Sequence, residues 1–395
     1  MKINDDITKI INDLVWWIPF KNKRNNLRNL LTNNIAKELS KFKEELNKAN
    51  ENNKLLEEEL NKANENNVLL KEELCKTKEN NLNIIKKAIN STIQLTTQYN
   101  DSEIMKNIFK ENVKLVEIGI SSFCNRKCWF CPNSIVDRFS RNIELDEYLF
   151  IKILKELQEI DYSNSLYLHR YNEPLYNKDL LLKRIKQARE YLPKSIIKVV
   201  SNGDYLTKEY LKELEEYGVN ELYISYYYNG NNKYIEFDLE NVIKPGMLKL
   251  INKLAIEYSE YIKNDNEYYM FMKYKNLNIE YKSLNMEKMG NDRGGVIEDV
   301  NIEERTSQCF LPNMQVSIDY DGTYSMCCNI RSDLEAHKDY IIGNIRDNTI
   351  FELFTNDKII NIRKKLLVYG KKEKVCANCA DYRPPGMVYF NLNIK

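Results

Sequence analysis

The sequence contains only two histidines, His169 and His337, among its 395 residues. This scarcity argues against a histidine-rich metal site and against Ser-His or Cys-His nucleophilic catalysis. No apolar run is long enough to span a membrane, and the opening MKINDDITKI lacks the basic start and apolar stretch of a signal peptide. Lys and Arg number 59 against 58 for Asp and Glu, so the charge gives no argument for a nucleic-acid partner. We therefore expect a cytoplasmic protein that does not bind nucleic acid.

The nine cysteines are the chemically informative residues. In a reducing cytoplasm they are expected to bind metal or to catalyse rather than to form disulfides. Three of them, Cys124, Cys128 and Cys131, lie within the segment SSFCNRKCWFCPNS. A disulfide uses two thiols and a structural zinc site uses four ligands. Three thiolates can instead hold three irons of a four-iron cluster and leave the fourth iron open for a small molecule.

A near-repeat in the N-terminal part predicts a coiled coil over residues 32–95. The segment EELNKANENNKLLE is followed by EELNKANENNVLLK, a period of two heptads. Apolar residues recur on one seam, which favours a two-stranded coil over a single amphipathic helix; its leucines and phenylalanine are Leu39, Phe42, Leu46, Leu56, Leu60, Leu70 and Leu74. Asn53 and Asn67 fall on the same seam and would fix its register. We predict a homodimer; the alternative is a solvated helix that folds back on its own chain.

Residues 1–31 form a separate N-terminal segment with aromatic and basic residues side by side. Trp16, Trp17 and Phe20 precede Lys23 and Arg24. This composition fits peripheral contact with a membrane interface, and it fits equally a hydrophobic plug that docks on protein. The stretch WWIPFKNKRNNLRN also resembles the N-terminal segments of some bacterial surface-polysaccharide proteins.

From residue 113 onward, strand-like and helix-like segments alternate. VKLVEIGISSFC, SLYLHRYNEP, IIKVVSNG, ELYISYYYN and YYMFMKYKNL read as strands, with amphipathic helical stretches between them. This alternation predicts an α/β fold with a parallel sheet built from right-handed crossovers. Functional sites of such folds form on the loops that follow the strands. The cysteine loop, NEP and SNG should therefore meet at one mouth.

The spacing Cys-x3-Cys-x-aromatic-Cys, met by Cys124, Cys128, Phe130 and Cys131, resembles the signature of the radical S-adenosylmethionine (SAM) enzymes. The resemblance implies a partial (β/α)6 TIM-like barrel over residues 113–295. It also implies a [4Fe–4S] cluster whose open iron binds SAM. Reduction by a one-electron donor such as flavodoxin or ferredoxin would then produce a 5′-deoxyadenosyl radical that abstracts a substrate hydrogen.

Other segments match the SAM-binding pattern of that family. RYNEPL resembles the family's GGEP segment, with Asn172 in a glycine position and Glu173 retained. The resemblance implies that Glu173 accepts hydrogen bonds from the SAM ammonium and that Phe130 packs beside the adenine. It also places the SNG segment and a polar strand-end residue along the cofactor, namely Ser201, Asn202, Gly203 and Ser225. Taken singly, NEP and SNG are also common turn sequences.

The C-terminal cysteines suggest a second metal site within residues 305–385. Cys309, Gly322 and Cys327 are followed by Cys376 and Cys379, which resembles the auxiliary-cluster domain of the SPASM and twitch subgroups. The chain lacks the further cysteines that a second auxiliary cluster requires, so the resemblance implies one auxiliary [4Fe–4S] cluster. A structural zinc site with the same four ligands is the alternative. Cys328 is adjacent to a ligand and is interpreted as spare; an exchange of roles with Cys327 is the alternative.

Two residues are candidates for substrate chemistry. Arg293 lies in NDRGGV, which resembles a segment at the junction of core and auxiliary domains, and it could face the substrate or pair with an acidic neighbour. His169 lies two positions after Tyr167 and could point into the barrel as an acid or base. A buried structural role is the alternative for His169.

These features predict a radical SAM enzyme of oxidoreductase type. The first hypothesis is oxidation of a carbohydrate or cyclitol alcohol in surface-polysaccharide or secondary metabolism. The second is modification of a peptide or protein, as in maturases that share the auxiliary domain. The third is a non-enzymatic coiled-coil assembly factor with a metal module, which the intact SAM-binding constellation disfavours.

Overall fold

The computed structural model describes residues 2–15, 21–300 and 303–380. It divides into two compact units, residues 1–87 and residues 88–395. Within the described ranges, no helix combines the length and the apolar character that a membrane span requires. The aromatic residues of the N-terminal segment, including Trp16, Trp17 and Phe20, lie outside the described residues.

The first unit contains α1 (Lys2–Val15) and most of α2 (Lys21–Thr96), a helix of 76 residues. Ile11 and Val15 of α1 are buried, whereas the leucines of the predicted seam are exposed along α2. The helix over the repeat is as expected, and its pairing with a second copy stays a prediction. The last turns of α2, from residue 88, belong to the second unit. There Leu95 is buried in the core and its carbonyl accepts a hydrogen bond from Arg363.

A ten-stranded sheet forms the centre of the second unit, in the order β10-β9-β8-β1-β2-β3-β4-β7-β6-β5. Six neighbouring strands run parallel, from β8 to β7. They are β8 (Gln315–Ile318), β1 (Leu115–Ile118), β2 (Ser165–Tyr167), β3 (Ile196–Ser201), β4 (Glu221–Ser225) and β7 (Leu277–Leu284). This arrangement confirms the predicted α/β class.

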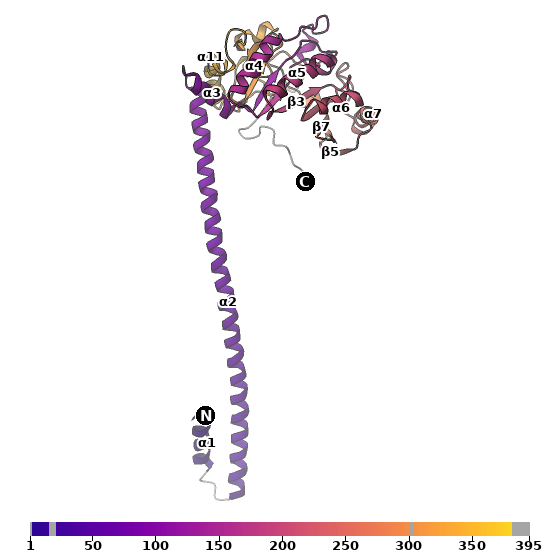
Figure 1. Ribbon diagram of the computed structural model, residues 1–395. Helices are drawn as coiled ribbons and strands as arrows, with labels where there is room; N and C mark the ends of the chain where they lie inside the picture. Colours follow the sequence, from indigo (N-terminus) through magenta and orange to yellow (C-terminus); the bar gives the residue numbers. More distant parts are fainter. Residues whose placement is uncertain (1, 16–20, 301–302, 381–395) are drawn as a thin grey trace. The chain divides into compact units, whose positions relative to one another are not determined.

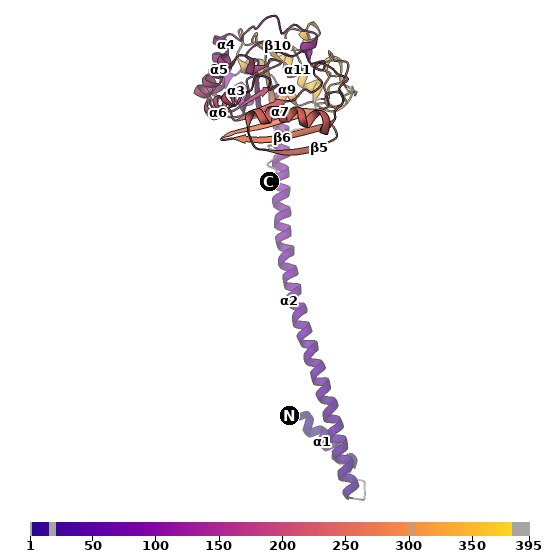
Figure 2. The same ribbon diagram turned by 90° about the vertical axis from the view of Figure 1, so that its right-hand side faces the viewer.

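Helices connect the parallel strands and cover one side of the sheet. They are α4 (Glu147–Glu159), α5 (Lys178–Tyr191), α6 (Lys208–Glu216) and α7 (Lys244–Leu254), and Figures 1 and 2 show α4, α5 and α6 following one another along the sheet. Side chains at the N-caps fix where three of these helices begin, because Asp146, Asn177 and Thr207 each accept a backbone N–H of the first turn. The inward strand residues and the apolar helix faces share one hydrophobic core.

Two features of the sheet differ from the expectation. The segment YYMFMKYKNL forms β6 (Glu267–Tyr274), which pairs antiparallel with β5 (Tyr258–Asn264) and with β7. The parallel neighbour of β4 is therefore β7, which follows β6 in the sequence. In addition, β8 comes from the segment expected to form the auxiliary domain, yet it pairs in parallel with β1. The core and the C-terminal part consequently share a continuous sheet.

The remaining elements complete the C-terminal part and the ends of the core. Strands β9 (Thr323–Ser325) and β10 (Ile341–Asn344) extend the sheet antiparallel beyond β8. The helices are α3 (Ser102–Asn112), α8 (Met286–Met289), α9 (Leu311–Met314), α10 (Ile350–Phe354) and α11 (Asp357–Leu366). Short one-turn helices η1 (Pro132–Ser134), η2 (Pro174–Tyr176), η4 (Glu335–Tyr340) and η5 (Lys374–Cys376), with the π-helical η3 (Leu239–Ile243), lie in the loops.

Candidate active site

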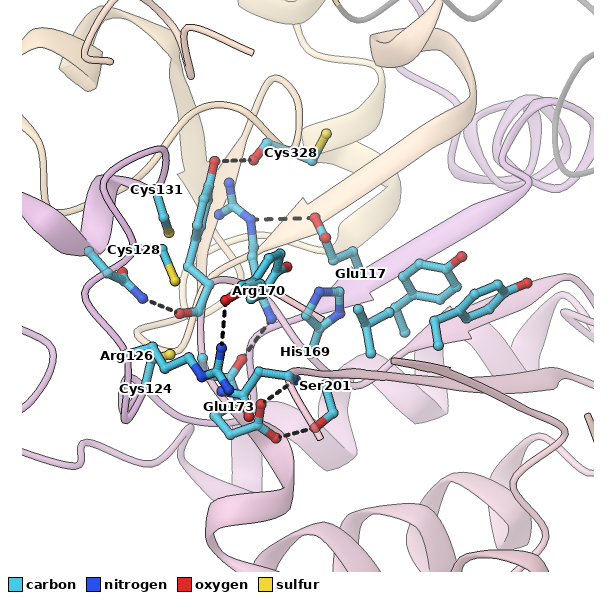
Figure 3. Close-up of a pocket in the computed structure, with 18 of the residues that line it drawn as sticks. Glu117, Cys124, Arg126, Cys128, Cys131, His169, Arg170, Glu173, Ser201 and Cys328 are labelled. Atoms are coloured by element: carbon cyan, nitrogen blue, oxygen red, sulfur yellow. Dashed lines mark hydrogen bonds and ion pairs between the residues drawn. The ribbon is translucent and has the colours of Figure 1, made fainter. Parts of the chain in front are cut away.

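A cavity of about 390 Å³ opens among the loops that follow the parallel strands. The cysteine loop after β1, the NEP segment after β2 and the SNG segment after β3 all border it, as expected for this fold. Figure 3 shows the three cysteines on one side of the cavity and His169 and Glu117 further in. The cavity thus joins the cysteine loop to the interior face of the sheet.

Backbone contacts hold the cysteine loop in place. The Cys124 N–H donates to the Arg138 carbonyl at 3.3 Å, and the Cys131 N–H donates to the Cys128 carbonyl at 2.9 Å. The loop after β4 packs directly on this segment: the Trp129 N–H donates to the Gly230 carbonyl at 3.1 Å. A Cβ at Gly230 would lie 2.8 Å from the Cys128 sulfur, so only glycine leaves room for that thiol.

The chemistry of the three thiols fits metal binding. No disulfide joins Cys124, Cys128 and Cys131, and all three border the cavity. Burial raises the pKa of the Cys124 thiol to about 12, and burial together with the neighbouring Cys131 raises that of Cys128 to about 12. Thiolates in this setting need a bound cation, because burial disfavours the charged form without one. The three donors therefore fit an iron–sulfur cluster with one open iron.

Glu173 of the NEP segment is buried and organises the neighbouring loop. Its carboxylate accepts hydrogen bonds from the Ser201 hydroxyl at 2.7 Å, the Asn202 N–H at 2.8 Å and the Leu175 N–H at 2.9 Å. Burial raises its pKa to about 7, although these hydrogen bonds lower it. Glu173 therefore joins the NEP and SNG segments and presents a partly protonated carboxyl at the cavity.

Asp204 continues this network into the cysteine loop. It accepts hydrogen bonds from the Arg126 guanidinium at Nε (2.7 Å) and at a terminal nitrogen, and from the Asn125 amide (2.8 Å). The Asn202 amide also donates to the Asn125 side-chain oxygen at 2.8 Å. Three separate segments are thereby tied together around the cysteines. Sequence reasoning did not single out Asp204, although its position directly after SNG was a usable signal.

The other residues expected at the cofactor divide into two groups. Phe130, Asn172, Ser201 and Asn202 border the cavity, whereas Gly203 and Ser225 are not among its lining residues. Gly203 has φ +80°, and a Cβ there would lie 2.8 Å from Ile224, so its role in the structure is a turn that only glycine fits. Ser225 is buried at the end of β4 and hydrogen-bonds to Tyr227, a residue that does line the cavity.

Both residues predicted for substrate chemistry border the same cavity. The His169 Nδ1 atom is buried and has no hydrogen-bond partner, and burial, with Arg170 nearby, lowers the pKa of this histidine to about 4. Arg293 has a left-handed backbone, φ 50°, and its guanidinium donates to the Asn329 side-chain oxygen at 3.0 Å. The imidazole is therefore neutral at pH 7, and Arg293 provides a positive charge.

Arg170 and Tyr171 connect the cavity to the C-terminal cysteine region. The buried Arg170 guanidinium donates to the Ser325 hydroxyl at 2.9 Å and to the carbonyls of Cys327 (3.3 Å) and Ile330. The Tyr171 hydroxyl donates to the Cys328 carbonyl at 2.9 Å. Cys328 itself borders the cavity, and its interpretation as a spare cysteine stays a prediction.

A buried charge network surrounds this connection, and no local sequence pattern indicated it. Arg170 lies 3.5 Å from the Glu117 carboxylate and 3.4 Å from that of Asp319. Arg138, which follows the cysteine loop, lies 3.6 Å from Asp319 and 2.9 Å from Asp333. These residues come from β1, the NEP segment, the cysteine loop and the C-terminal part. Removing one member would leave an uncompensated buried charge, which is strongly destabilising.

The four C-terminal cysteines line a second, smaller cavity with Arg305 and Asn329; they are Cys309, Cys327, Cys376 and Cys379. Amide groups of Asn291 and Asn329 point at the Cys379 sulfur, at 3.6 Å and 3.7 Å. Burial, followed by the charge of Cys309, raises the pKa of Cys376 to about 12. No three His, Cys, Asp or Glu side chains in the described part of the chain are placed to hold a single metal ion. Four thiols with nearby amide donors fit the donor chemistry of an iron–sulfur cluster.

Comparison with known proteins matches both regions. The family model described as "Radical SAM superfamily" matches residues 118–227, and the one described as "Iron-sulfur cluster-binding domain" (SPASM) matches residues 309–380. A curated relative, the S-adenosyl-L-methionine-dependent 2-deoxy-scyllo-inosamine dehydrogenase of Niallia circulans, is 24% identical over 267 residues, covering 67% of this chain and 92% of the relative.

One solved structure supports the same fold. The structure of BtrN in complex with AdoMet and 2-DOIA has a TM-score of 0.50 and 22% identity, covering 68% of this chain and 93% of BtrN. A structure of BtrN in an open conformation has a TM-score of 0.45 and 21% identity, covering 68% of this chain and 92% of BtrN. Together with the three-cysteine cavity, the two family-model matches show a radical SAM domain followed by a C-terminal iron–sulfur cluster-binding domain of the SPASM type.

Proposed function

We propose that this enzyme oxidises a secondary alcohol of a cyclitol or related carbohydrate. The observation that carries the proposal is the shared cavity. It brings the three-cysteine loop, His169, Arg293 and the cysteine region of the C-terminal part to one cavity. The similarity to an inosamine dehydrogenase supports an alcohol as the reacting group.

The residues proposed to hold the cofactors follow from the cavity. Cys124, Cys128 and Cys131 would bind one [4Fe–4S] cluster, and SAM would lie against Phe130, Asn172, Glu173 and the SNG segment. When bound, these groups supply a 5′-deoxyadenosyl radical that takes a hydrogen atom from the substrate, and the auxiliary cluster supplies a one-electron acceptor. Electrons for the first cluster would come from a small donor protein such as flavodoxin or ferredoxin.

The protein's own contribution is to hold the reacting hydroxyl and its proton. Loss of the carbinol hydrogen makes the hydroxyl more acidic, so the site must stabilise a negative oxygen. Arg293 is suited to this because its guanidinium remains charged at any working pH. His169 is neutral, and its low pKa favours a hydrogen-bonding role over that of a strong base.

Cys309, Cys327, Cys376 and Cys379 are proposed to hold the auxiliary cluster. Arg170 fixes the backbone of Cys327 from the cavity side, and Tyr171 fixes that of Cys328. The substrate would therefore be bound beside the loop that carries a cluster ligand. This proximity suits transfer of one electron from the substrate to the auxiliary site.

Self-association through α2 is a separate part of the proposal. The seam residues Leu46, Leu60 and Leu74 are each more than half exposed in the single chain. A parallel second copy would cover this seam, with Asn53 and Asn67 paired across it. Membrane contact through the N-terminal aromatic residues stays a prediction, since they lie outside the described residues.

The proposed oxidation is tested by isotope transfer. We would incubate reconstituted enzyme with 2-deoxy-scyllo-inosamine that is deuterated at the carbinol carbon. Deuterium in 5′-deoxyadenosine, ketone formation and one SAM consumed per ketone are expected. The unlabelled compound gives the background, and the variant lacking all three loop cysteines should give none of these products. Label that arises only from a peptide substrate would contradict an alcohol as the reacting group.

A further inference from the structure

The inner end of the cavity is unusually polar for the interior of a parallel β/α sheet. Each of the six parallel strands contributes a lining side chain: Glu117, Tyr167, Val200, Tyr223, Lys282 and Gln315. In closed barrels of this type the interior is filled mainly by branched apolar side chains that pack against one another. Five of the six strands therefore present polar groups to this cavity, which suits a polar ligand.

His169 gives a second, independent indication of a ligand. Its Nδ1 atom is buried beside the cavity without a hydrogen-bond partner. Leaving such an atom unpaired is unfavourable because it has lost its hydrogen bonds to water, so a bound group is expected to satisfy it. A neutral imidazole nitrogen either donates or accepts, according to the tautomer. A hydroxyl group satisfies both cases, whereas a phosphate oxygen only accepts.

Two of the cations at the cavity, Arg170 and Arg126, are already engaged with acceptors of the protein. Arg170 uses its nitrogens on Glu117, Asp319, Ser325 and two backbone carbonyls. Arg126 is bound by Asp204 on two nitrogens and lies 3.5 Å from the Tyr227 carbonyl with the third. These guanidinium groups have little capacity left for an anionic ligand.

The lysines on the strands are likewise paired with carboxylates. Lys282 pairs with Glu280 at 3.0 Å, and the buried Lys198 pairs with Glu221 at 2.8 Å. Glu117 adds a carboxylate at the inner end, with the Ser317 hydroxyl 3.0 Å away. Arg293 lies apart from these pairs, on the side of the C-terminal part, where it donates to Asn329. The inner end therefore offers no excess positive charge to a phosphate.

We propose that this inner end is a subsite for the part of the substrate remote from the reacting carbon. It takes an unphosphorylated polyol ring, neutral or amine-bearing, and excludes phosphorylated and nucleotide-linked sugars. The proposal rests on the function proposed above and narrows its substrate class. Placing a phosphate beside Glu117 would bury two like charges together, which is unfavourable in a cavity of low dielectric.

The first test compares ligands on the unaltered protein. Full-length reconstituted enzyme with bound SAM is titrated calorimetrically with inositol, 2-deoxy-scyllo-inosamine and inositol monophosphate. We expect inositol and the inosamine to bind and the phosphate to bind at least about tenfold more weakly, which corresponds to about 1.4 kcal/mol. Phosphate binding within threefold of inositol, or no binding by any of the three, would overturn the proposal.

The second test gives the phosphate a binding partner. Glu280→Gln removes the acid that neutralises Lys282 and leaves that ammonium to attract an anion. We expect inositol monophosphate to bind this variant at least threefold more tightly than wild type, with inositol unchanged. Glu260→Gln is the matched control, because Glu260 pairs with Lys244 at 2.9 Å on another part of the sheet and neither residue lines the cavity.

The outcome is separable from that of the proposed oxidation. Deuterium transfer from any cyclitol supports alcohol oxidation whatever the charge preference. Oxidation of a phosphorylated cyclitol would refute only the proposed exclusion of anions and would leave the proposed alcohol oxidation supported. An unchanged phosphate affinity in Glu280→Gln, with the variant folded and its iron content normal, would also contradict the charge argument.

Discussion

The hydrogen-bond network at Asp204 leads to a prediction about how the first cluster is held. Asp204→Ala removes two hydrogen bonds to Arg126 and one to Asn125, both of which lie between Cys124 and Cys128. A hydrogen bond to a charged group contributes about 1.5–3 kcal/mol. The Asp204 side chain is 34% exposed, so solvent screening reduces that figure. We expect the ordered cysteine loop to lose about 1–2 kcal/mol.

Such a loss should appear in iron retention rather than in global folding. A change of 1.4 kcal/mol is tenfold in an equilibrium constant, so the variant should release iron from the first site at about tenfold lower chelator concentration. The measurement is iron content and electron paramagnetic resonance after anaerobic incubation with a graded chelator. The auxiliary signal should be unaffected, because its four cysteines lie elsewhere in the fold.

Glu147→Ala is a suitable control for Asp204→Ala. Glu147 likewise binds one cation and one amide, Lys183 at 2.6 Å and Gln187 at 2.5 Å, but it lies on the outer helix α4. Its loss should leave iron retention at the wild-type level. Equal retention in wild type and Asp204→Ala, or equal loss in both variants, would refute the reasoning that Asp204 specifically orders the cysteine loop.

Three further predictions concern metal content, chain architecture and pH. The wild-type protein, reconstituted without oxygen, should bind about eight irons per chain. Replacing Cys124, Cys128 and Cys131 with alanine should remove about half of this iron and abolish SAM cleavage. Zinc in the C-terminal site would contradict the auxiliary-cluster assignment. By light scattering, the full chain should be a dimer and a variant without residues 1–87 should be a folded monomer. Deletion of residues 1–95 should destabilise the core, because the buried Leu95 is lost. A monomeric full chain would contradict the coiled-coil interpretation. Burial lowers the pKa of His169 to about 4 in the folded protein, below its value in the unfolded chain. The stability that depends on a neutral His169 is therefore present above the unfolded pKa and is lost as the pH falls toward the folded pKa. Iron-free wild type should therefore lose about 2 kcal/mol more stability than His169→Gln between about pH 7.5 and pH 5 in urea unfolding, and parallel losses would exclude this linkage.

Local patterns made much of the fold and part of the site predictable. The strands that end in the cysteine loop, in NEP and in SNG could be predicted, because each is an apolar run followed within a few positions by turn residues. The convergence of Cys131, Glu173 and Asn202 followed from the rule that loops after parallel strands meet. The segment 268–277 was misplaced by one strand, because a two-sided apolar run looks the same in an antiparallel and a parallel pair.

What could not be predicted depends on contacts between distant segments. Glu117, Asp319 and Arg138 read individually as ordinary charged residues, and only folding places them in one buried network. The pairing of β8 with β1 is of the same kind, since 200 positions separate Glu117 from its partner Ser317. Exposure is also invisible in the sequence, so the cavity-facing position of Cys328 required the fold.

The segment from His169 to Glu173 connects the cavity to both cysteine regions. Successive side chains of this one loop reach different parts of the site: His169 borders the inner cavity, Arg170 and Tyr171 bind the backbone at Cys327 and Cys328, and Glu173 holds SNG. Tyr171 adopts φ 56°, a conformation that costs a non-glycine residue energy and persists where its surroundings fix it. A displacement of this loop would therefore move the wall of the cavity and the backbone of an auxiliary ligand together. Under the proposed function, a substrate bound against His169 would therefore contact the same loop that holds the backbone of Cys327.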